Sequence, residues 1–184
     1  MNITQNSTIF YQLREKFSFL RYEKFEIKLV EEVIHIDFHF NLSDQYFFQP
    51  TVEIPLKDFP ALVNLNNPVI HNLAFHMGLI ELISYWKTAC PARIIIEPAA
   101  LDDSQIQFWK KVWYQGLGEF FYLNGIEISM NDFVSVECSS KNSFEKDSVL
   151  TLKEQVLVPV GGGKDSAVSL EILKKSDKNI FPFA

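Results

Sequence analysis

The sequence predicts an α+β N-terminal domain, consisting of an antiparallel meander plus two helices, followed by the first βα unit of an incomplete α/β domain. Three features of the 184-residue chain support this fold class. Apolar and polar residues alternate between residues 24 and 54, two segments with helical periodicity follow, and a strand–glycine–helix sequence comes near the end. The stretch 138–148 has the composition of a loop, so we expect domains at 1–148 and 149–184.

The first part of the chain is predicted to form a meander with one solvated face. The apolar positions of the first strand alternate with Lys and Glu, and they are Phe25, Ile27 and Leu29. The apolar positions of the second strand are Ile34, Ile36, Phe38 and Phe40. A third strand is expected over 46–54, where Pro50 indicates an edge position or a bulge. Alternation of this kind is typical of antiparallel strands that bury one face.

Three polar side chains on the second strand, His35, Asp37 and His39, are a possible metal site. Side chains two residues apart on a strand share a face. A tight site also needs ligands from other elements and an ordered shell around them. We therefore favour the simpler interpretation, in which these residues form the solvent side of an amphipathic strand.

A first helix is predicted to begin at Asn67 and Pro68 and to end before Cys90, because Asn67 suits the N-cap and Pro68 the first helical position. Gly78 in its interior costs about 1 kcal/mol relative to Ala, which indicates the close approach of another backbone or a ligand. The polar residues around this glycine are His76, Glu81, Tyr85 and Lys87. Their ordinary interpretation is a satisfied histidine, an exposed glutamate, a tyrosine at the edge of the core and a solvated lysine.

The middle of the chain is predicted to add a strand, a helix and a second strand. The continuous apolar run at 93–97 is typical of a strand buried on both faces. A second helix is expected to begin at 102–104 and to end at 124–125, with a kink or break at Gly116 and Gly118. Residues 126–136 return to strand character.

Three glycines separate the last apolar run from the last helical segment. The full turn is Gly161, Gly162, Gly163, Lys164, Asp165 and Ser166. It is not a Walker A loop, which needs a glycine at the position of Val158, and it is not a dinucleotide fingerprint. A strand, a glycine turn and a helix nevertheless present backbone N–H groups and a positive helix end to phosphate. Lys164 adds charge, Ser166 can donate a hydroxyl, and Asp165 can hold a divalent cation or simply cap the helix.

The composition argues against several classes of protein. The net charge of −6, without a run of Lys or Arg, argues against nucleic acid as the main partner. Cys90 and Cys138 have no metal-binding spacing, so we expect free thiols in a reduced, cytoplasmic protein. The N-terminus lacks the pattern of a signal peptide, and no apolar run approaches the ~20 residues that span a bilayer, so no membrane partner is expected.

The glycine turn resembles the PP-loop signature of ATP pyrophosphatases, Ser-Gly-Gly-x-Asp-Ser, with Gly161 in place of the leading Ser. Together with residues 76–87, Cys90-Pro91, the Trp-rich helix and residues 158–166, it resembles one bacterial family, the UDP-N-acetylmuramoyl-L-alanyl-L-glutamate epimerases. The similarity extends over most of the chain. It implies that the second domain is a PP-loop-like, ATP-binding α/β domain.

The resemblance also implies a reaction in peptidoglycan precursor synthesis. ATP and Mg²⁺ would convert the terminal L-glutamate carboxyl of the UDP-muramoyl dipeptide to an acyl adenylate, and a base would remove the Cα proton before reprotonation gives the D centre. The turn at 161–166 would bind ATP, with Asp165 as a metal ligand. The candidates for the base are His76, Glu81 and Lys87, and the residues themselves do not distinguish among them.

A nucleotide domain of this kind needs several strands after the first βα unit, and few residues follow Ser166. We therefore expect an N-terminal fragment that binds ATP weakly or not at all. Two other functions stay open. One is a different PP-loop ATP pyrophosphatase or ligase that acts on another carboxylate, and the other is a non-catalytic α+β binding module whose glycine turn is structural.

Overall fold

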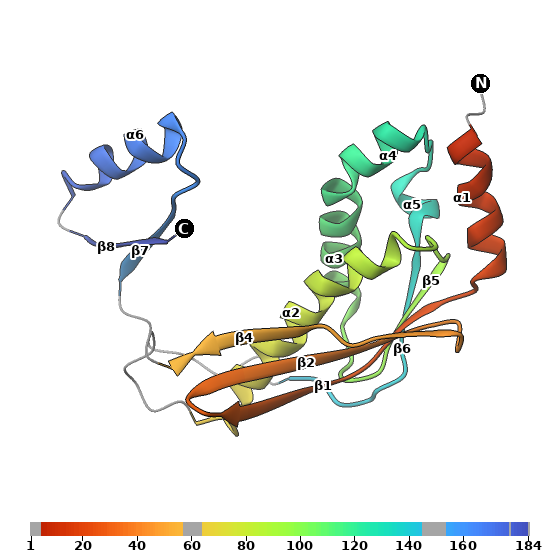
Figure 1. The fold of residues 1–184 in the computed structure, drawn as a ribbon, viewed down its shortest axis with the longest axis horizontal. Helices are drawn as coiled ribbons and strands as arrows, with labels where there is room; N and C mark the ends of the chain where they lie inside the picture. The colour runs from red at the N-terminus through yellow and green to blue at the C-terminus, as the bar shows by residue number, and fades with distance from the viewer. Residues whose placement is uncertain (1–4, 57–63, 145–153, 177, 184) are drawn as a thin grey trace. The chain divides into compact units, whose positions relative to one another are not determined.

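The computed structural model describes residues 5–56, 64–144, 154–176 and 178–183. The chain separates into two compact units, residues 1–146 and 147–184 (Figure 1). Within the described residues, the first unit contains a six-stranded mixed sheet and five helices, and the second contains two strands and one helix. The α+β class predicted for the N-terminal region is therefore confirmed, but the number of helices expected there was too low.

The elements of the first unit follow one another in this order: α1 (Gln5–Lys16), β1 (Leu20–Val30), β2 (Val33–Leu42), β3 (Tyr46–Phe48), β4 (Thr51–Pro55), α2 (Pro68–Trp86), β5 (Arg93–Ile96), α3 (Asp103–Gly116), α4 (Gly118–Asn124), α5 (Met130–Phe133) and β6 (Ser135–Cys138). The sheet order is β3-β2-β1-β5-β6, and β4 pairs with the other end of β2. Strands β1 to β4 form the predicted antiparallel meander, whereas β5 and β6 add in parallel. The sheet is therefore mixed rather than purely antiparallel.

The expected single strand over 46–54 is two strands, β3 and β4, separated at Gln49 and Pro50. Proline has no N–H with which to continue a ladder. Its carbonyl still accepts a hydrogen bond from the Phe38 N–H at 2.9 Å, so the backbone stays against β2 through the break. Pro50 thus marks an irregularity at the edge of the sheet, as the sequence indicated.

Helix α2 packs on the apolar face of β1 and β2 and forms the centre of the core. The buried residues on this helix are Ala74, Phe75, Gly78, Leu79, Leu82 and Trp86. On β2 they include the alternating set Ile34, Ile36, Phe38 and Phe40. Figure 1 shows α2, α3 and α4 on the same side of the sheet. The helix begins as predicted, because the Asn67 side chain accepts a hydrogen bond from the Val69 N–H and Pro68 occupies the first turn.

Gly78 lies against the ring of Tyr22, which is fully buried on β1. Neither another backbone nor a ligand is the close neighbour, so that part of the expectation was wrong. The Tyr22 ring stacks on Phe75 of α2 with its centroid 5.9 Å away and the planes 7° apart. The missing Cβ at position 78 therefore allows a tyrosine to pack directly beneath the helix.

The second predicted helix is two helices, α3 and α4. Asp102 and Gln105 form a reciprocal capping box at the start of α3. The break falls at Leu117, between the two glycines, and α4 ends at Gly125 with φ 60°. The expected strand over 126–136 was wrong in its first part, because Ser129 caps the short helix α5 before β6 begins at Ser135.

Helix α1 was not predicted from the sequence. It buries Phe10, and the residue just after it, Phe17, is also in the core. Arg14 donates to three backbone carbonyls, of Cys90 at 3.0 Å, Asp132 at 2.8 Å and Phe133 at 2.6 Å. Contacts far along the chain thus hold this polar helix in place.

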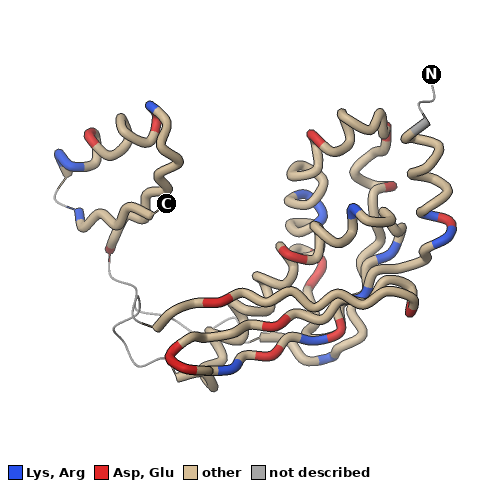
Figure 2. The backbone as a smooth tube through the Cα atoms, viewed as in Figure 1, with Lys and Arg blue, Asp and Glu red and all other residues tan. Residues whose placement is uncertain are grey.

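Charged residues of both signs are interspersed along β1 and β2 (Figure 2). Lys28 pairs with Glu26 at 2.7 Å and with Asp37 at 3.2 Å. Asp37 also accepts a hydrogen bond from Thr51, and His35 lies 3.6 Å from Glu53. These contacts favour the simple interpretation of His35, Asp37 and His39 as one side of an amphipathic strand. Within the described ranges, no group of three or more His, Cys, Asp or Glu residues is arranged to hold a metal ion.

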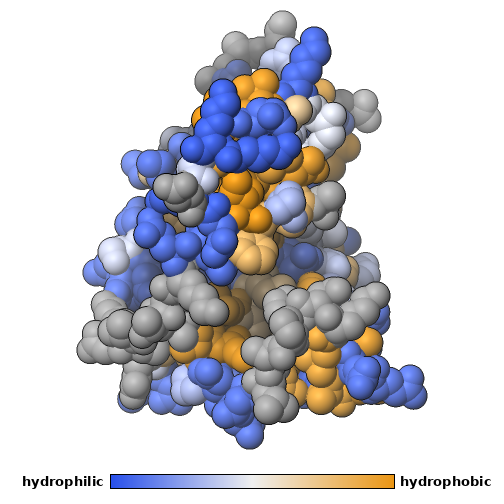
Figure 3. Space-filling view, turned by 90° about the vertical axis from the view of Figure 1, so that its left-hand side faces the viewer, coloured by the Kyte–Doolittle hydropathy of each residue, from blue (hydrophilic) through white to orange (hydrophobic). Residues whose placement is uncertain are grey.

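The second unit consists of β7 (Gln155–Pro159), α6 (Lys164–Leu173) and β8 (Asn179–Phe183). The two strands are parallel and paired from Gln155–Asn179 to Pro159–Phe183, so the unit is a βαβ element. Large apolar side chains remain exposed on it, and they are Leu157, Val168, Ile172, Phe181 and Phe183. Apolar surface is visible among hydrophilic residues on the side of the molecule drawn in Figure 3.

None of the helices in the described parts of the chain combines the length and the apolar character needed to cross a membrane.

Candidate functional site

The glycine turn lies at the carboxyl end of β7 and leads directly into α6. Gly162 has φ +75°, a conformation that other residues rarely adopt. Gly161, Gly162 and Gly163 are exposed, and a Cβ at any of them would meet nothing within 4 Å. The carboxyl end of a parallel strand is where ligands bind in α/β folds. The turn is therefore open to a ligand approaching along its backbone.

No side chain caps the N-terminus of α6. Gly163 is the N-cap residue, with no side-chain hydrogen bond at that position. Ser166 instead donates its hydroxyl to the Gly163 carbonyl at 3.2 Å. The alternative in which Asp165 or Ser166 caps a structural helix is therefore wrong. A helix start without a side-chain cap leaves backbone N–H groups for an anion, and the helix dipole favours negative charge there.

The residues Lys164, Asp165 and Ser166 occupy the first turn of α6. The Lys164 and Asp165 side chains are exposed, so both can meet a ligand at the turn. An ammonium, a hydroxyl and a carboxylate at a phosphate-binding turn are the groups that bind a phosphate together with its divalent cation. The side chains of Lys164, Asp165 and Ser166 therefore fit a polyphosphate that carries a bound Mg²⁺ ion.

The other three candidate residues, His76, Glu81 and Lys87, do not converge. On a regular helix, Glu81 lies about 140° around the axis from His76. Lys87 lies about 16 Å along the axis from His76. Lys87 is the C-cap residue of α2. His76 and Lys87 line separate cavities, and Glu81 lines neither of these two. The three residues therefore cannot act together on one atom.

His76 lines an open groove of about 400 Å³ between α2 and α3. The other lining residues are Ser104, Gln105, Phe108 and Trp109. The imidazole stacks on the Trp109 indole with a centroid separation of 5.6 Å and an angle of 16°. Its Nδ1 atom is buried without a hydrogen-bond partner in the described structure. Burial lowers the pKa of His76 below its ordinary value, so the ring is neutral at pH 7.

One contact ties α3 to α2, and a second, within α3, holds Phe108 against Trp109 at this groove. The Trp113 Nε1–H donates to the Leu79 carbonyl at 2.8 Å, which ties α3 to α2. Phe108 packs edge-on against Trp109, yet its side chain is 59% exposed. Trp109 and Trp113 are buried, but Phe108 presents a ring to solvent at the rim of a cavity.

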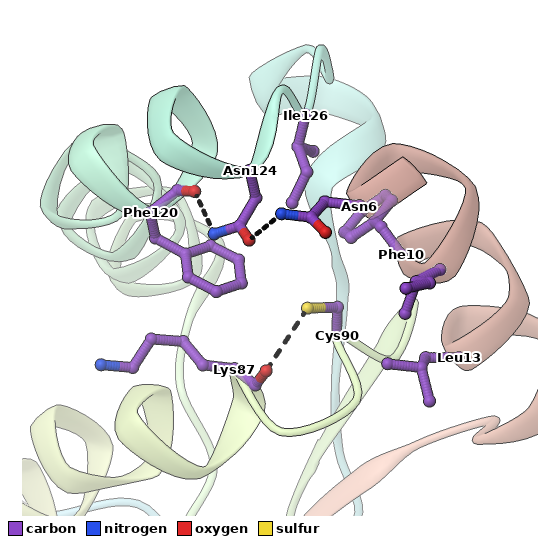
Figure 4. A pocket seen from close by; sticks show the side chains of 9 residues that line it. Asn6, Phe10, Leu13, Lys87, Cys90, Phe120, Asn124 and Ile126 are labelled. Carbon is purple, nitrogen blue, oxygen red and sulfur yellow. Dashed lines mark hydrogen bonds between the residues drawn. The ribbon is translucent and has the colours of Figure 1, made fainter. Parts of the chain in front are cut away.

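Lys87 lies at a smaller cavity, of about 150 Å³, between α1, α4 and the end of α2 (Figure 4). The hydrogen bond from Asn6 to Asn124, 3.2 Å long, crosses one side of it. The Cys90 thiol lies 3.7 Å from the Lys87 carbonyl. Figure 4 shows the Lys87 ammonium group beneath Phe120 and pointing away from Cys90. Burial raises the pKa of Cys90 to about 12, so this thiol is unreactive at neutral pH.

The architecture defines a class: an α+β N-terminal domain followed in the chain by a βαβ unit whose glycine turn leads into a helix with no side-chain cap. A family model described as the MurL N-terminal domain matches residues 11–184. The chain belongs to this family.

Three curated relatives are named UDP-N-acetyl-alpha-D-muramoyl-L-alanyl-L-glutamate epimerase. The protein from Xanthomonas oryzae pv. oryzae is 33% identical over 124 residues, which are 67% of this chain and 27% of the relative. The Salinispora tropica protein is 33% identical over 111 residues, 59% of this chain and 23% of the relative. The Micromonospora protein is 31% identical over 140 residues, 74% of this chain and 30% of the relative. No solved structure matches the chain.

The resemblance inferred from the sequence is therefore confirmed at the level of the family. The matched regions span less than a third of each relative, so the activity named for the relatives belongs to much longer proteins.

Proposed function

We propose that this chain is the N-terminal part of an ATP-dependent epimerase, which inverts the Cα of the terminal L-glutamate in UDP-N-acetylmuramoyl-L-alanyl-L-glutamate. Membership of the MurL N-terminal domain family is the observation that carries this proposal. The names of the three relatives supply the substrate, a UDP-linked muramoyl dipeptide of peptidoglycan synthesis. The glycine turn leads into a helix with no side-chain cap, which supports the use of a nucleoside triphosphate.

The glycine turn would hold the phosphates of ATP. Backbone N–H groups at 161–166 would meet the phosphate oxygens, and Lys164 would add an ammonium. Ser166 would add its hydroxyl by turning from the Gly163 carbonyl, to which it donates here. Asp165 would hold Mg²⁺ next to them, and the ion supplies charge neutralisation for the leaving pyrophosphate. The exposed carboxylate in the first turn of α6 fits this role, because it is the one acidic group in that turn.

Activation of the substrate explains why an epimerase would consume ATP. A glutamate carboxylate oxygen attacks the α-phosphorus, pyrophosphate leaves, and an acyl adenylate forms. The Cα proton of this mixed anhydride is more acidic than that of a carboxylate, because the enolate carries less negative charge. A base takes the proton, reprotonation from the opposite face gives the D centre, and water releases AMP and the free carboxylate.

Proton transfer at Cα needs a base within hydrogen-bond reach of that proton. The candidates are His76 and Glu81 on α2 and Lys87 at its C-cap. Because they lie apart along the helix, they are tested one by one. The two faces of Cα require either two groups or one group that reaches both sides. Groups from outside this chain remain compatible with the reaction, since the relatives extend well beyond the matched region.

The second unit is proposed to be the beginning of a larger PP-loop-like domain. Parallel strands are normally covered on both faces. Here Leu157 on β7, Ile172 on α6 and Phe181 on β8 are each at least half exposed. More strands and helices would cover these side chains in the whole enzyme. The 184-residue chain alone is accordingly expected to bind ATP weakly and to lack epimerase activity.

The test measures AMP release by the complete gene product with ATP, Mg²⁺ and the UDP-muramoyl dipeptide. AMP formation should require the dipeptide, and Lys164→Ala or Asp165→Asn should reduce it by at least about 100-fold, as for loss of other charge-stabilising groups. Lys174→Ala is the matched control, because this exposed lysine lies at the other end of α6, where it pairs with Glu171 of the same helix. AMP release that is independent of the dipeptide, or unaffected by the loop substitutions, would contradict the proposal.

A further inference from the structure

We propose that the groove between α2 and α3 is a nucleobase-binding site. This proposal rests on the proposed function, in which two nucleotides meet the enzyme, a uridine diphosphate sugar and ATP. The shared chemistry is a flat, uncharged heterocycle with hydrogen-bonding edges.

The lining of the groove selects against charged ligands. Its five residues are His76, Ser104, Gln105, Phe108 and Trp109, and none is a lysine, arginine or carboxylate. A diphosphate or a glutamate carboxylate would have no cation in this lining. The volume of about 400 Å³ lies in the range of small-molecule sites. An apolar, aromatic wall with a few polar groups is the usual surround of a heterocyclic ring.

The rim offers a surface for stacking. The Phe108 side chain is 59% exposed, while its edge is held against Trp109 with centroids 5.5 Å apart. Trp109 is in turn backed by the His76 ring. The exposed Phe108 ring therefore lies against a layer of two further aromatic rings. Stacking of a base on an aromatic side chain contributes about 1–3 kcal/mol.

Two adjacent polar groups provide a donor and an acceptor. The Gln105 Oε1 atom accepts the Asp102 N–H at 2.9 Å, which fixes the amide and leaves its Nε2–H₂ group as a donor. The Ser104 hydroxyl donates to Asp102 at 2.6 Å, which leaves its oxygen lone pairs as acceptors. A neighbouring donor and acceptor complement the C=O and N–H edge of uracil, and also the N1 and amino edge of adenine. Both groups belong to residues that line the groove and that the contacts to Asp102 hold in place.

This assignment makes His76 a positioning residue that supports Trp109. Glu81 on α2 and Lys87 at its C-cap then remain as the candidates for the base that takes the Cα proton. The two roles of His76 have different kinetic signatures. Loss of a binding wall raises KM for the nucleotide at unchanged kcat, whereas loss of the base lowers kcat at saturating substrate.

The binding test uses the 184-residue chain and its tryptophan fluorescence. UMP, AMP and ribose 5-phosphate are titrated separately, and Trp109 reports a base in the groove. Saturable quenching by UMP assigns the groove to the substrate's uracil, and quenching by AMP assigns it to adenine. Phe108→Ala should weaken the binding about tenfold or more. Gln105→Glu should weaken it as well, because it keeps the oxygen that accepts the Asp102 N–H and removes the donor.

Tyr122→Ala is the matched control, since Tyr122 is an aromatic residue on α4 that is 85% exposed and outside the groove. It should leave the affinity unchanged. Absence of saturable quenching by both nucleotides would overturn the proposal. So would an equal response to ribose 5-phosphate, an unaltered affinity in Phe108→Ala, or a response that disappears only in Lys164→Ala. Circular dichroism establishes that each variant is folded.

His76→Gln in the complete gene product gives the kinetic test. A raised KM with kcat unchanged is expected, and a loss of kcat at saturating substrate would overturn the proposal. A failure of the nucleobase-site proposal is distinguishable from a failure of the proposed epimerase function. Deuterium exchange at Cα without nucleotide binding in the groove would reject the groove alone, whereas nucleotide binding without exchange would reject the epimerase.

Discussion

The ring of Tyr22 occupies the space where a side chain at position 78 would lie. A Cβ atom on Gly78 would overlap the Tyr22 hydroxyl and come within 2.8 Å of its Cε1 atom. Both residues are buried, and Tyr22 is also stacked on Phe75. Helix α2 and strand β1 are therefore held in contact by a tyrosine that only a glycine can accommodate.

Gly78→Ala is expected to lower the free energy of unfolding by about 1–3 kcal/mol, because overpacking outweighs the gain of about 1 kcal/mol in helix propensity. Urea denaturation measures the change. Gly116→Ala is the matched control, since a Cβ there meets nothing within 4 Å. It should be neutral or slightly stabilising. Equal stability of the Gly78→Ala variant and the unmodified protein would show that the Tyr22 ring can move aside.

Tyr22→Phe is expected to leave stability at pH 7 unchanged or to increase it. The hydroxyl is buried with no hydrogen-bond partner in the described structure. Taking it out of water costs free energy that no hydrogen bond offsets, and its removal ends this cost. Burial raises the pKa of Tyr22 above its ordinary value of 10.0. The unfolded state then loses its proton first as the pH rises, so the native protein loses stability above about pH 10.

The Phe variant should show a shallower decline above pH 10, measured by urea denaturation between pH 7 and 11. A clear loss of stability at pH 7 would instead reveal that the hydroxyl has a hydrogen-bond partner.

Arg14→Lys is expected to destabilise the protein by about 1–3 kcal/mol. The Arg14 guanidinium donates to the carbonyls of Cys90, Asp132 and Phe133. A lysine side chain is shorter and ends in a single ammonium group, so it cannot donate to all three carbonyls in the same way. Arg93→Lys is the control, because its pair with Glu137 is exposed and should contribute less than about 1 kcal/mol. Thermal and urea unfolding compare the two. Similar effects in both variants would argue against the anchoring role of Arg14.

His76 is expected to make the protein less stable in weak acid. Burial lowers the pKa of the folded-state imidazole below the ordinary 6.5. Below pH 6.5 the unfolded state therefore binds a proton that the folded state does not, and stability falls as the pH decreases. His76→Gln should reduce this dependence between pH 7 and 5. A ring that titrates near pH 6.5 in the folded protein, observed by NMR, would contradict it.

Features determined by neighbouring residues could be predicted from the sequence. Asn67 with Pro68, the Asp102 cap and the left-handed Gly125 all depend on local side-chain and backbone geometry. Helix α1 could not, because its first residues are polar and its stability depends on Phe10 and on the distant carbonyls that Arg14 contacts.

The sites divide in the same way. The strand, the glycine turn and the helix at 155–173 follow from a contiguous sequence, and the phosphate-binding role expected for the turn stays a prediction. The groove depends on His76 and Trp109, which come from different helices and meet only when α2 and α3 pack together. The nearest neighbour of Gly78 likewise comes from β1, far along the chain. Long-range packing of this kind has no signature in the pattern of one segment.

Deuterium incorporation tests the central claim most directly. The complete gene product is incubated in deuterated water with ATP, Mg²⁺ and UDP-N-acetylmuramoyl-L-alanyl-L-glutamate, and the glutamate Cα position is followed by NMR and mass spectrometry. We predict one deuterium at Cα in the D-glutamate product, formed only when ATP is present and lost in Lys164→Ala. ATP consumption with no deuterium at Cα would contradict epimerisation and would indicate a ligase instead.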